Sequence, residues 1–469
     1  MAIHVPDHVL PAPEIREIPP AAPLRRMLGP SIILAGLSVG SGEFVLWPRL
    51  VVEHGFVIFW AAWIGVTIQF FLNLEIERWT LATGESAVTG FFRLSKWFGP
   101  VFLLCATVPW IWPGWATGAA QIITWETELD DGAVPWLAVG GLVLCGAILS
   151  LGPVVYRTVE RLMAVLVTAI FVALLAIAFW LVDLPAIREL LAGAMNIGHL
   201  PEGIHLPVFL GALAFAGAGG ALNLAQSNYI KDKGFGMGAH VGRITSPFTG
   251  REEAASDIGY VLRADAEGIA RFRLWWRRAN IEHFFSFFVL CLLSLALFCL
   301  VAHVLRRGQG EPTEGFGFIR DQAEALRTHW GGFAGHAFLG TGVLVLFTTE
   351  LALLDGVSRV AADTLKVPFF RDDERVTSSR LYFIVLWSLI AFGATVLLVG
   401  FDQPFQLLVI SAALNGFVMF LYSGLLLVLN AKTFRGPLRP HPVRLLALGV
   451  ACAFFGYFSI LTLMDKLGL

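Results

Sequence analysis

Charge is scarce in this sequence. Only 14% of its 469 residues are Asp, Glu, Lys or Arg, whereas water-soluble domains carry roughly 25%. Another 57% are hydrophobic, including 38 Phe and 15 Trp, so these apolar side chains need a solvent other than water. The formal net charge of -2 leaves no basic excess to neutralise phosphates, which excludes a general nucleic-acid binder. The composition indicates an integral membrane protein.

The sequence also has little reactive or ligating chemistry. Its 5 cysteines all fall in apolar runs, without the spacing of a zinc site or of a disulfide framework, so they are expected to be small buried hydrophobes. No nucleophile and base pair or phosphate loop stands out, so we expect neither an enzyme nor a cofactor. Residues 1–27 form a polar, proline-rich segment without the apolar core of a signal peptide. They are predicted to be a loose cytoplasmic tail.

Long apolar runs are abundant. A spanning helix needs about 20 mostly apolar residues, and eleven stretches qualify: 29–50, 55–78, 98–120, 134–152, 158–182, 206–230, 281–305, 334–358, 380–400, 403–430 and 442–464. Lys and Arg concentrate in alternate loops, with Arg306 and Arg307 as the exception. By the positive-inside rule, this predicts an all-α protein of the inner (plasma) membrane with a cytoplasmic N-terminus.

The spans divide into two halves. Residues 28–183 hold spans one to five, residues 184–430 hold spans six to ten, and residues 431–469 hold span eleven and the C-terminus. The long cytoplasmic loop 231–280 ends in WWRRAN, which is typical of a helix lying at the lipid headgroups. A gating or regulatory role for this loop stays open.

The first span of each half contains a glycine cluster. The stretch VGSGEFVLWP (39–48) places Gly40, Ser41 and Gly42 mid-span, where their helix propensity is weak. The stretch AFAGAGGALN (214–223) repeats the pattern in span six. Matching broken helices indicate an inverted-repeat transporter, because an unwound segment is tolerated in a membrane only when it is buried in protein or lines an aqueous cavity. Close helix packing through small residues is the alternative.

Glu43 is the ionisable residue beside the first glycine cluster. A charge at the bilayer centre costs about 3 kcal/mol, so Glu43 is expected to face a cavity with a partner, or to be protonated. The alternative is a position near the outer interface beside Trp47 and Arg49.

Three stretches resemble the Nramp family of proton-coupled divalent-metal transporters. They are GPSIILAGLSVGSGEF (29–44), Gln69 with LATGE (81–85), and ALAFAGAGGALNLAQSNY (212–229). The resemblance implies a leucine-transporter fold, in which a 5+5 inverted repeat with discontinuous helices 1 and 6 works by alternating access.

The family's metal-binding motifs do not carry over intact. The resemblance puts Gly40 at the family's metal-binding aspartate, Glu43 at its asparagine, Ala221 at its methionine and Asn223 at its histidine. Without the thioether, the preference for soft metals is lost, so a hard ion such as Mg²⁺ or Mn²⁺ is expected. Where the family has acidic residues for proton transfer, this chain has the uncharged WIWPGWATGAA (110–120), so coupling along that route is not expected.

The predicted substrate site combines both glycine clusters. Its members are Gly40, Ser41, Gly42, Glu43, Gly217, Ala218, Gly219, Gly220, Ala221 and Asn223. The expected metal ligands are the Glu43 carboxylate, the carbonyls of Gly40 and Ala218, and the Asn223 amide, an oxygen set suited to a hard ion.

Two other functions stay open. GSGEF followed by LWP is similar to a signature of amino-acid permeases, which would make the substrate a small organic solute such as an amino acid or amine. The second open function is that of a non-transporting receptor built on a carrier fold. In each case the partners are a small cation or molecule and the lipid bilayer, and a monomer is expected.

Other ionisable residues are candidates for coupling ions or protons: Glu350, Asp355, Arg359 and His283. Asp355 and Arg359 are spaced to pair on one helix face. Glu350 suits either a coupling site or a helix–helix hydrogen bond. His283, with Glu282, is placed at the membrane interface, as is His336. Asn415 in span ten could reach the central cavity or bond a neighbouring helix.

Overall fold

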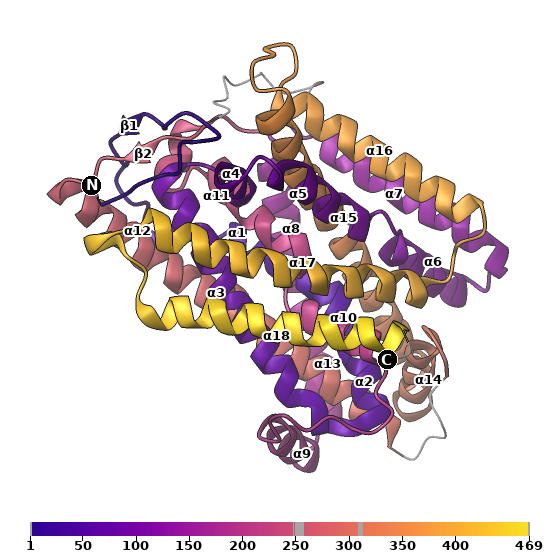
Figure 1. Cartoon of the computed structure of the whole chain (residues 1–469). Coiled ribbons are helices and arrows are strands. Elements are labelled where there is room, and N and C mark those ends of the chain that lie inside the picture. Colours follow the sequence, from indigo (N-terminus) through magenta and orange to yellow (C-terminus); the bar gives the residue numbers. More distant parts are fainter. Residues whose placement is uncertain (1, 247, 249–257, 308–312, 468–469) are drawn as a thin grey trace.

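A computed structural model describes residues 2–246, 248, 258–307 and 313–467. The predicted spans are all helical, and Figure 1 shows them packed as one bundle. The first span consists of α1 (Pro30–Ser38), a π-helix (Val39–Leu46) and α2 (Trp47–His54), and spans two to five are α3 (Phe59–Thr83), α5 (Phe98–Thr107) with α6 (Gly114–Thr127), α7 (Val134–Leu151) and α8 (Val155–Leu181). The sixth span consists of α10 (Leu206–Ala214) and α11 (Ala225–Lys233), and the seventh follows α12 (Ala266–His283) as a π-helix (Phe284–Val289) and α13 (Leu290–Arg306). The last four spans are α15 (Gly332–Phe369), α16 (Ser378–Leu398), α17 (Pro404–Thr433) and α18 (Pro442–Leu467).

By length and composition, 8 helical stretches among the described residues could cross a membrane. One of them, Pro30–Thr83, contains both the first and the second span. The third and sixth spans do not qualify because each is interrupted, and neither half is long enough to cross alone; α10 and α11 have only 9 residues each. The lower number therefore reflects two interrupted spans and one stretch that contains two spans.

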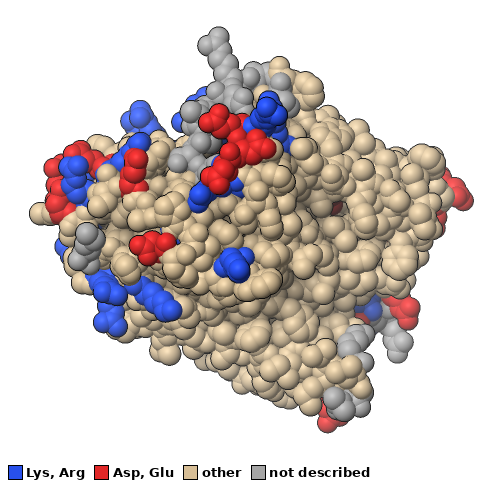
Figure 2. All heavy atoms as spheres, turned by 45° about the horizontal axis from the view of Figure 1, so that its top comes forward, with Lys and Arg blue, Asp and Glu red and all other residues tan. Residues whose placement is uncertain are grey.

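The outer surface of the bundle is apolar. Large side chains such as Phe179, Trp180 and Val399 are more than 70% exposed. Figure 2 shows Lys, Arg, Asp and Glu gathered mainly over the left and top of that view, with others at the right and lower edges, while much of the surface between them is uncharged. An exposed apolar belt of this kind suits lipid rather than water.

One end of the bundle carries the N-terminal tail and is called here the tail end. Strand β1 (Ile15–Arg16) pairs in parallel with β2 (Val261–Leu262), and Ile3 forms a bridge with Phe434; Figure 1 shows N, β1, β2 and α12 together. The prediction of a loose tail is wrong. The indole of Trp275 donates to the carbonyl of Pro19 and Arg278 donates to that of Ala21, so the tail supplies acceptors that these side chains need.

The opposite end carries α9 (Leu184–Ala194) and α14 (Gly317–Trp330), at the bottom of Figure 1. Arg307 there is bonded to Asp183 at 2.6 Å and to Glu189 at 3.3 Å. This arginine, which lay on the wrong side of the predicted topology, is thus matched by acidic residues of α9 and its N-cap.

Candidate functional site

The interruption of the first span is a π-helix. The α-helical pattern stops at Ser38 and resumes at Trp47, and residues Val39–Leu46 between them form the wider helix. The sequence located this interruption correctly. Its form differs from the unwound segment that was expected, because backbone groups in a membrane need partners and a π-turn keeps them hydrogen-bonded. Interruptions of α-helices by π-turns are frequently found at functional sites. The Ser41 side chain lies outside the described part of the structure.

The interruption of the sixth span is a true break. After α10 the chain is irregular to Gly219, and a short 3-10 turn (Gly220–Leu224) leads into α11. Gly219 has φ +79° and Gly220 has φ +52°, values that side-chain-bearing residues rarely adopt. These two residues therefore need to be glycine for the chain to turn here.

Amide side chains from two other spans satisfy the broken backbone. Gln69 of α3 donates to the carbonyl of Ala214 at 2.8 Å and accepts from the N–H of Gly219 at 3.1 Å. Asn415 of α17 accepts from the N–H of Ala221 at 3.2 Å. Asn415 therefore makes a hydrogen bond to a neighbouring span, one of the two alternatives predicted for it.

The two interruptions touch each other at Gly42. A Cβ atom on Gly42 would lie 2.9 Å from the Cβ of Phe215 and would collide with the Phe215 carbonyl. Gly42 thus lets the first span approach the point where α10 ends. The first interruption therefore meets the end of α10 at Gly42, whereas Gly40 packs against Thr349 of α15 and Gly220 against Asn415 of α17.

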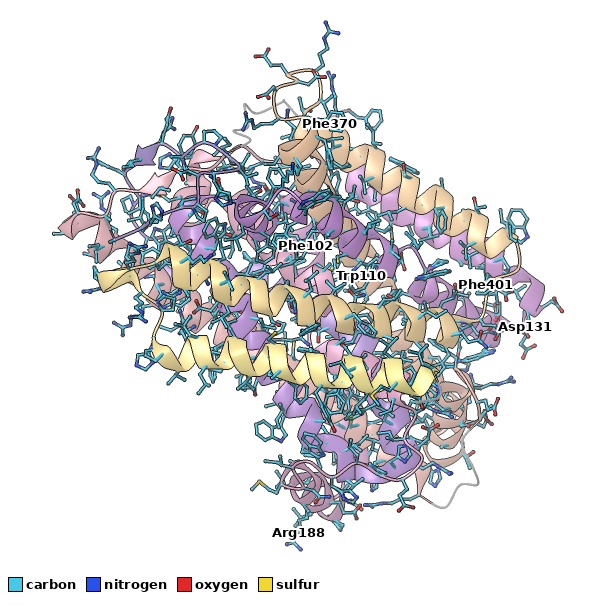
Figure 3. The ribbon with its side chains drawn as sticks, viewed as in Figure 1. Phe102, Trp110, Asp131, Arg188, Phe370 and Phe401 are labelled. Carbon is cyan, nitrogen blue, oxygen red and sulfur yellow. The ribbon has the colours of Figure 1, made fainter. Side chains whose placement is uncertain are left out.

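A third interruption, in span three, was not predicted. Helix α5 gives way to a 3-10 turn (Val108–Trp110), and α6 starts at Gly114 after the residues Ile111–Pro113. Trp110 stacks on Phe215 with ring centroids 5.5 Å apart and on Trp115 at 5.7 Å. In Figure 3, Trp110 lies in the middle of the bundle, whereas Asp131 and Arg188 lie at its edges. An aromatic cluster, Trp110, Trp115 and Phe215, therefore covers the contact between spans one and six.

Glu43 is fully buried, at 0% exposure. Its carboxylate accepts hydrogen bonds from the hydroxyls of Ser38, at 2.5 Å, and of Ser294 on α13. The thiol of Cys291 lies within hydrogen-bonding reach of the same carboxylate. Glu43 therefore points toward span seven in this structure.

Asn223 lies in a different environment. Its amide nitrogen donates to Tyr422 at 2.8 Å and to Gln69 at 3.2 Å, while its oxygen has no hydrogen-bond partner among the described residues. No hydrogen bond found in the described part of the chain joins Asn223 to Glu43. Nor do the described residues contain a group of three or more His, Cys, Asp or Glu placed to hold a metal ion. Any ion at the centre would depend on one carboxylate and neutral oxygens.

Asp355 and Arg359 form the ion pair that their spacing predicts. The Nε of Arg359 lies 2.9 Å from both oxygens of Asp355, and both side chains are fully buried. Asp232 of α11 also bonds Arg359, and Tyr382 of α16 donates to Asp355 at 2.8 Å. The sequence could not reveal these last two partners because they come from other helices. The network ties α11, α15 and α16 together.

The remaining candidates are placed as follows. Glu350 accepts from the N–H of Ala116 at 3.2 Å, a helix–helix hydrogen bond of the kind expected for it. His336 is exposed and bonds Glu126, which fits an interfacial position. Glu282 and His283, predicted at the start of span seven, are buried within the protein, with exposures of 2% and 0%, because α12 continues directly into span seven and α1 packs over this junction.

A cavity of about 610 Å³ lies at the tail end, between the end of α3, α11, the end of α15 and the start of α16. Its lining is strongly polar. Asn228 and Lys231 of α11 both donate to Asp363, at 2.7 and 2.8 Å. Helix α11 leads from the break in span six to this cavity, so it connects the centre of the bundle with the tail end.

Helical spans with an apolar outer belt, interrupted where the first and sixth meet, define a multi-pass membrane transporter of the leucine-transporter type. Within this class the chain belongs to the Nramp family: residues 54–465 match the family described as natural resistance-associated macrophage protein-like.

Solved structures share this fold at low identity. A mutant of the manganese transporter of Eremococcus coleocola has a TM-score of 0.68 and 12% identity, covering 97% of this chain and 90% of that one. The same transporter in complex with an aromatic bis-isothiourea substituted compound has a TM-score of 0.67, with the same identity and coverage. Mhp1, a nucleobase-cation-symport-1 family transporter, has a TM-score of 0.52 and 13% identity, covering 95% of this chain and 92% of that one. No curated protein sequence matches the chain.

Proposed function

We propose that this protein is a secondary-active carrier that moves a divalent metal cation by alternating access, through a site between the interruptions of spans one and six. The observation that carries the proposal is Glu43, a fully buried carboxylate within the π-helix, one residue from the contact between Gly42 and Phe215. A carboxylate kept at the centre of a bundle surrounded by lipid is a functional residue by default. The manganese transporter with the same fold supports this substrate class.

The proposed ligands are those expected from the sequence: Glu43, the carbonyl oxygens of Gly40 and Ala218, and Asn223. The unpartnered oxygen of Asn223 supports its inclusion. In this structure Glu43 bonds hydroxyls of α1 and α13 instead, so binding requires it to turn toward span six. Carboxylate, carbonyl and amide oxygens suit a hard ion such as Mg²⁺ or Mn²⁺.

We further propose that the protein resides in the inner (plasma) membrane with its tail end in the cytoplasm. The tail end carries the basic residues of alternate loops, and Arg307 at the other end is bonded to acidic side chains. In this orientation the cavity at the tail end is the cytoplasmic vestibule.

Calorimetric titration of the purified protein with Mn²⁺, Mg²⁺ and Ca²⁺ tests the cation. Binding heat is expected with at least one ion, and E43Q should remove it because the only carboxylate of the proposed ligand set is lost. Ser459→Ala, a buried polar residue of α18 far along the chain from the site, serves as the control and should bind as the wild type does. Silence with all three ions would overturn the proposal.

An organic solute is the second candidate, favoured by the aromatic cluster. Trp110, Trp115 and Phe215 stack at the break in span six, and the indole N–H groups of both tryptophans have no partner among the described residues. Aromatic faces beside free donors suit a small organic substrate such as an amino acid or amine. A thermal-shift panel of amino acids and amines should then show stabilisation that Trp110→Ala removes, whereas a flat panel counts against it. Ligand binding without exchange in liposomes would instead indicate a receptor.

A further inference from the structure

A chain of hydrogen bonds links three buried side chains where α1 begins and α12 ends. The hydroxyl of Ser31 donates to Oε2 of Glu282 at 2.5 Å, and Nδ1 of His283 lies 2.8 Å from the same hydroxyl oxygen. Because the single hydroxyl proton is directed at Glu282, Nδ1 of His283 must be the donor to Ser31. Both ends of the chain are open: Oε1 of Glu282 and Nε2 of His283 have no partner among the described residues.

A second carboxylate lies beside this chain. Glu77 of α3 is 1% exposed, and neither of its oxygens has a hydrogen-bond partner in the described part of the structure. Helices α3 and α12, which carry Glu77 and Glu282, pack against each other. Asn73, one turn before Glu77 on the same helix face, is fully buried and has both amide atoms unpartnered. One further turn along this face is Gln69, which bonds the break in span six.

The carboxylate oxygens of Glu77 and Glu282 are better suited to binding a proton than to binding a metal ion. A buried carboxylate without a counter-charge is strongly unfavourable. Glu77 also lacks a donor among the described residues, and Glu282 has one on only one of its oxygens, so a cation would stabilise both. The nearest basic group, Lys233, is already bonded to Glu160 and to the carbonyl of Leu28. The neighbouring Tyr156 hydroxyl is neutral. No cluster capable of holding a metal occurs among the described residues, and a proton needs no such cluster.

We propose that Glu282, reached through His283 and Ser31 and facing Glu77, binds the proton that drives transport, and that this proton loosens the start of α1. The proposal rests on the carrier function proposed above. A proton from water enters at Nε2 of His283, and Nδ1 passes its own proton to the Ser31 oxygen. The hydroxyl proton of Ser31 moves to Oε2 of Glu282. One proton is gained, Glu282 becomes neutral, and His283 ends neutral with its proton on Nε2.

The link to α1 is the hydrogen bond between Ser31 and Glu282. Ser31 lies in the first turn of α1, and its hydroxyl donates to the carboxylate of Glu282 on α12 at 2.5 Å. Charge-assisted hydrogen bonds are about twice as strong as neutral ones. Neutralising Glu282 therefore weakens the attachment of α1 to α12. Helix α1 leads into the π-helix that carries Glu43, so the proton site and the substrate site share one element.

The test is uptake of Mn²⁺ by full-length protein in liposomes, with and without an inward proton gradient, while an internal dye reports pH. The wild type should be stimulated by the gradient and should acidify the lumen. E282Q keeps the size of the side chain and its bond to Ser31 but cannot gain a proton. It should retain exchange of Mn²⁺ at equal pH and lose the stimulation. S31A, which breaks the relay, should slow the response to the gradient.

The control is E14Q, which removes an exposed carboxylate of the tail end outside the relay and should leave the response to the gradient unchanged. Stimulation of E282Q equal to that of the wild type would overturn the inference. So would a wild type that takes up Mn²⁺ without moving protons. Failure of the proposed function itself looks different, because the wild type would then bind and move no cation at any pH.

Discussion

The carboxylate of Glu350 on α15 caps the second half of the third span, since its Oε2 accepts the backbone N–H of Ala116 at 3.2 Å. Helix α6 has no capping side chain within its own sequence. A residue 234 positions along the chain therefore does what a neighbouring Ser or Asp does in an ordinary helix.

E350A should lower the free energy of unfolding by about 1–2 kcal/mol, because an N-terminal cap is lost. E350Q should recover most of this loss, since its amide oxygen still accepts the hydrogen bond. Thermal unfolding in detergent measures both variants. If E350Q instead abolished proton-coupled uptake while remaining fully stable, Glu350 would be a coupling site and not only a cap.

G42A should prevent the close approach of spans one and six, because the added Cβ would lie 2.9 Å from the Cβ of Phe215 and would meet its carbonyl. Overpacking of this kind destabilises by about 1–3 kcal/mol, and transport should be lost. The control is G140A on α7, where an added Cβ meets nothing within 4 Å; it should transport normally and be slightly more stable. Equal activity of both variants would show that the contact is dispensable.

R93A should release the N-terminal tail. Arg93 lies 2.6 Å from Glu85 and is fully buried, and it donates to the carbonyls of Pro6 and Pro11 at 3.0 and 3.1 Å. Removing one partner of a buried ion pair costs about 3–5 kcal/mol, so the variant should unfold earlier and its tail should be cleaved faster in limited proteolysis. R25A, at an exposed position of the tail, should change neither property.

Asp183, outside the membrane-spanning helices, should contribute a pH-dependent stability. The pKa of its carboxyl lies below the usual 3.8, first because it accepts the N–H of Ala186 at the start of α9 and then because Arg307 is bonded to it. A lowered folded pKa gives stability that is present above the unfolded pKa and lost as pH falls through the folded one. Melting temperatures below pH 5 should therefore fall more steeply for the wild type than for D183N. Parallel curves would contradict this.

The sequence was sufficient for the spans and for the location of two interruptions. Apolar length predicts helices in lipid, and Gly219 and Gly220 take conformations that require glycine. The form of the first interruption could not be predicted, because propensity shows where an α-helix is weak and not which geometry replaces it. The third interruption was not predicted from the sequence, although Pro109 and Pro113 lack the backbone N–H that would continue an α-helix.

The functional environment was harder to predict because its contacts are distant in sequence. Ser31 and Glu282 are 251 positions apart, as are Glu43 and Ser294. The burial of Glu282 and His283 could not be predicted, because nothing in the local sequence shows that α1 covers them. Residue type marked Glu43 as functional, but only the packing reveals that it turns toward span seven.

Aromatic rings, and not an ion pair, meet at the break in span six, where Trp110 stacks on both Trp115 and Phe215. Rotation of a few aromatic side chains could therefore gate the passage without unravelling any backbone. Such a gate would respond to the bulk of a solute and would be insensitive to salt.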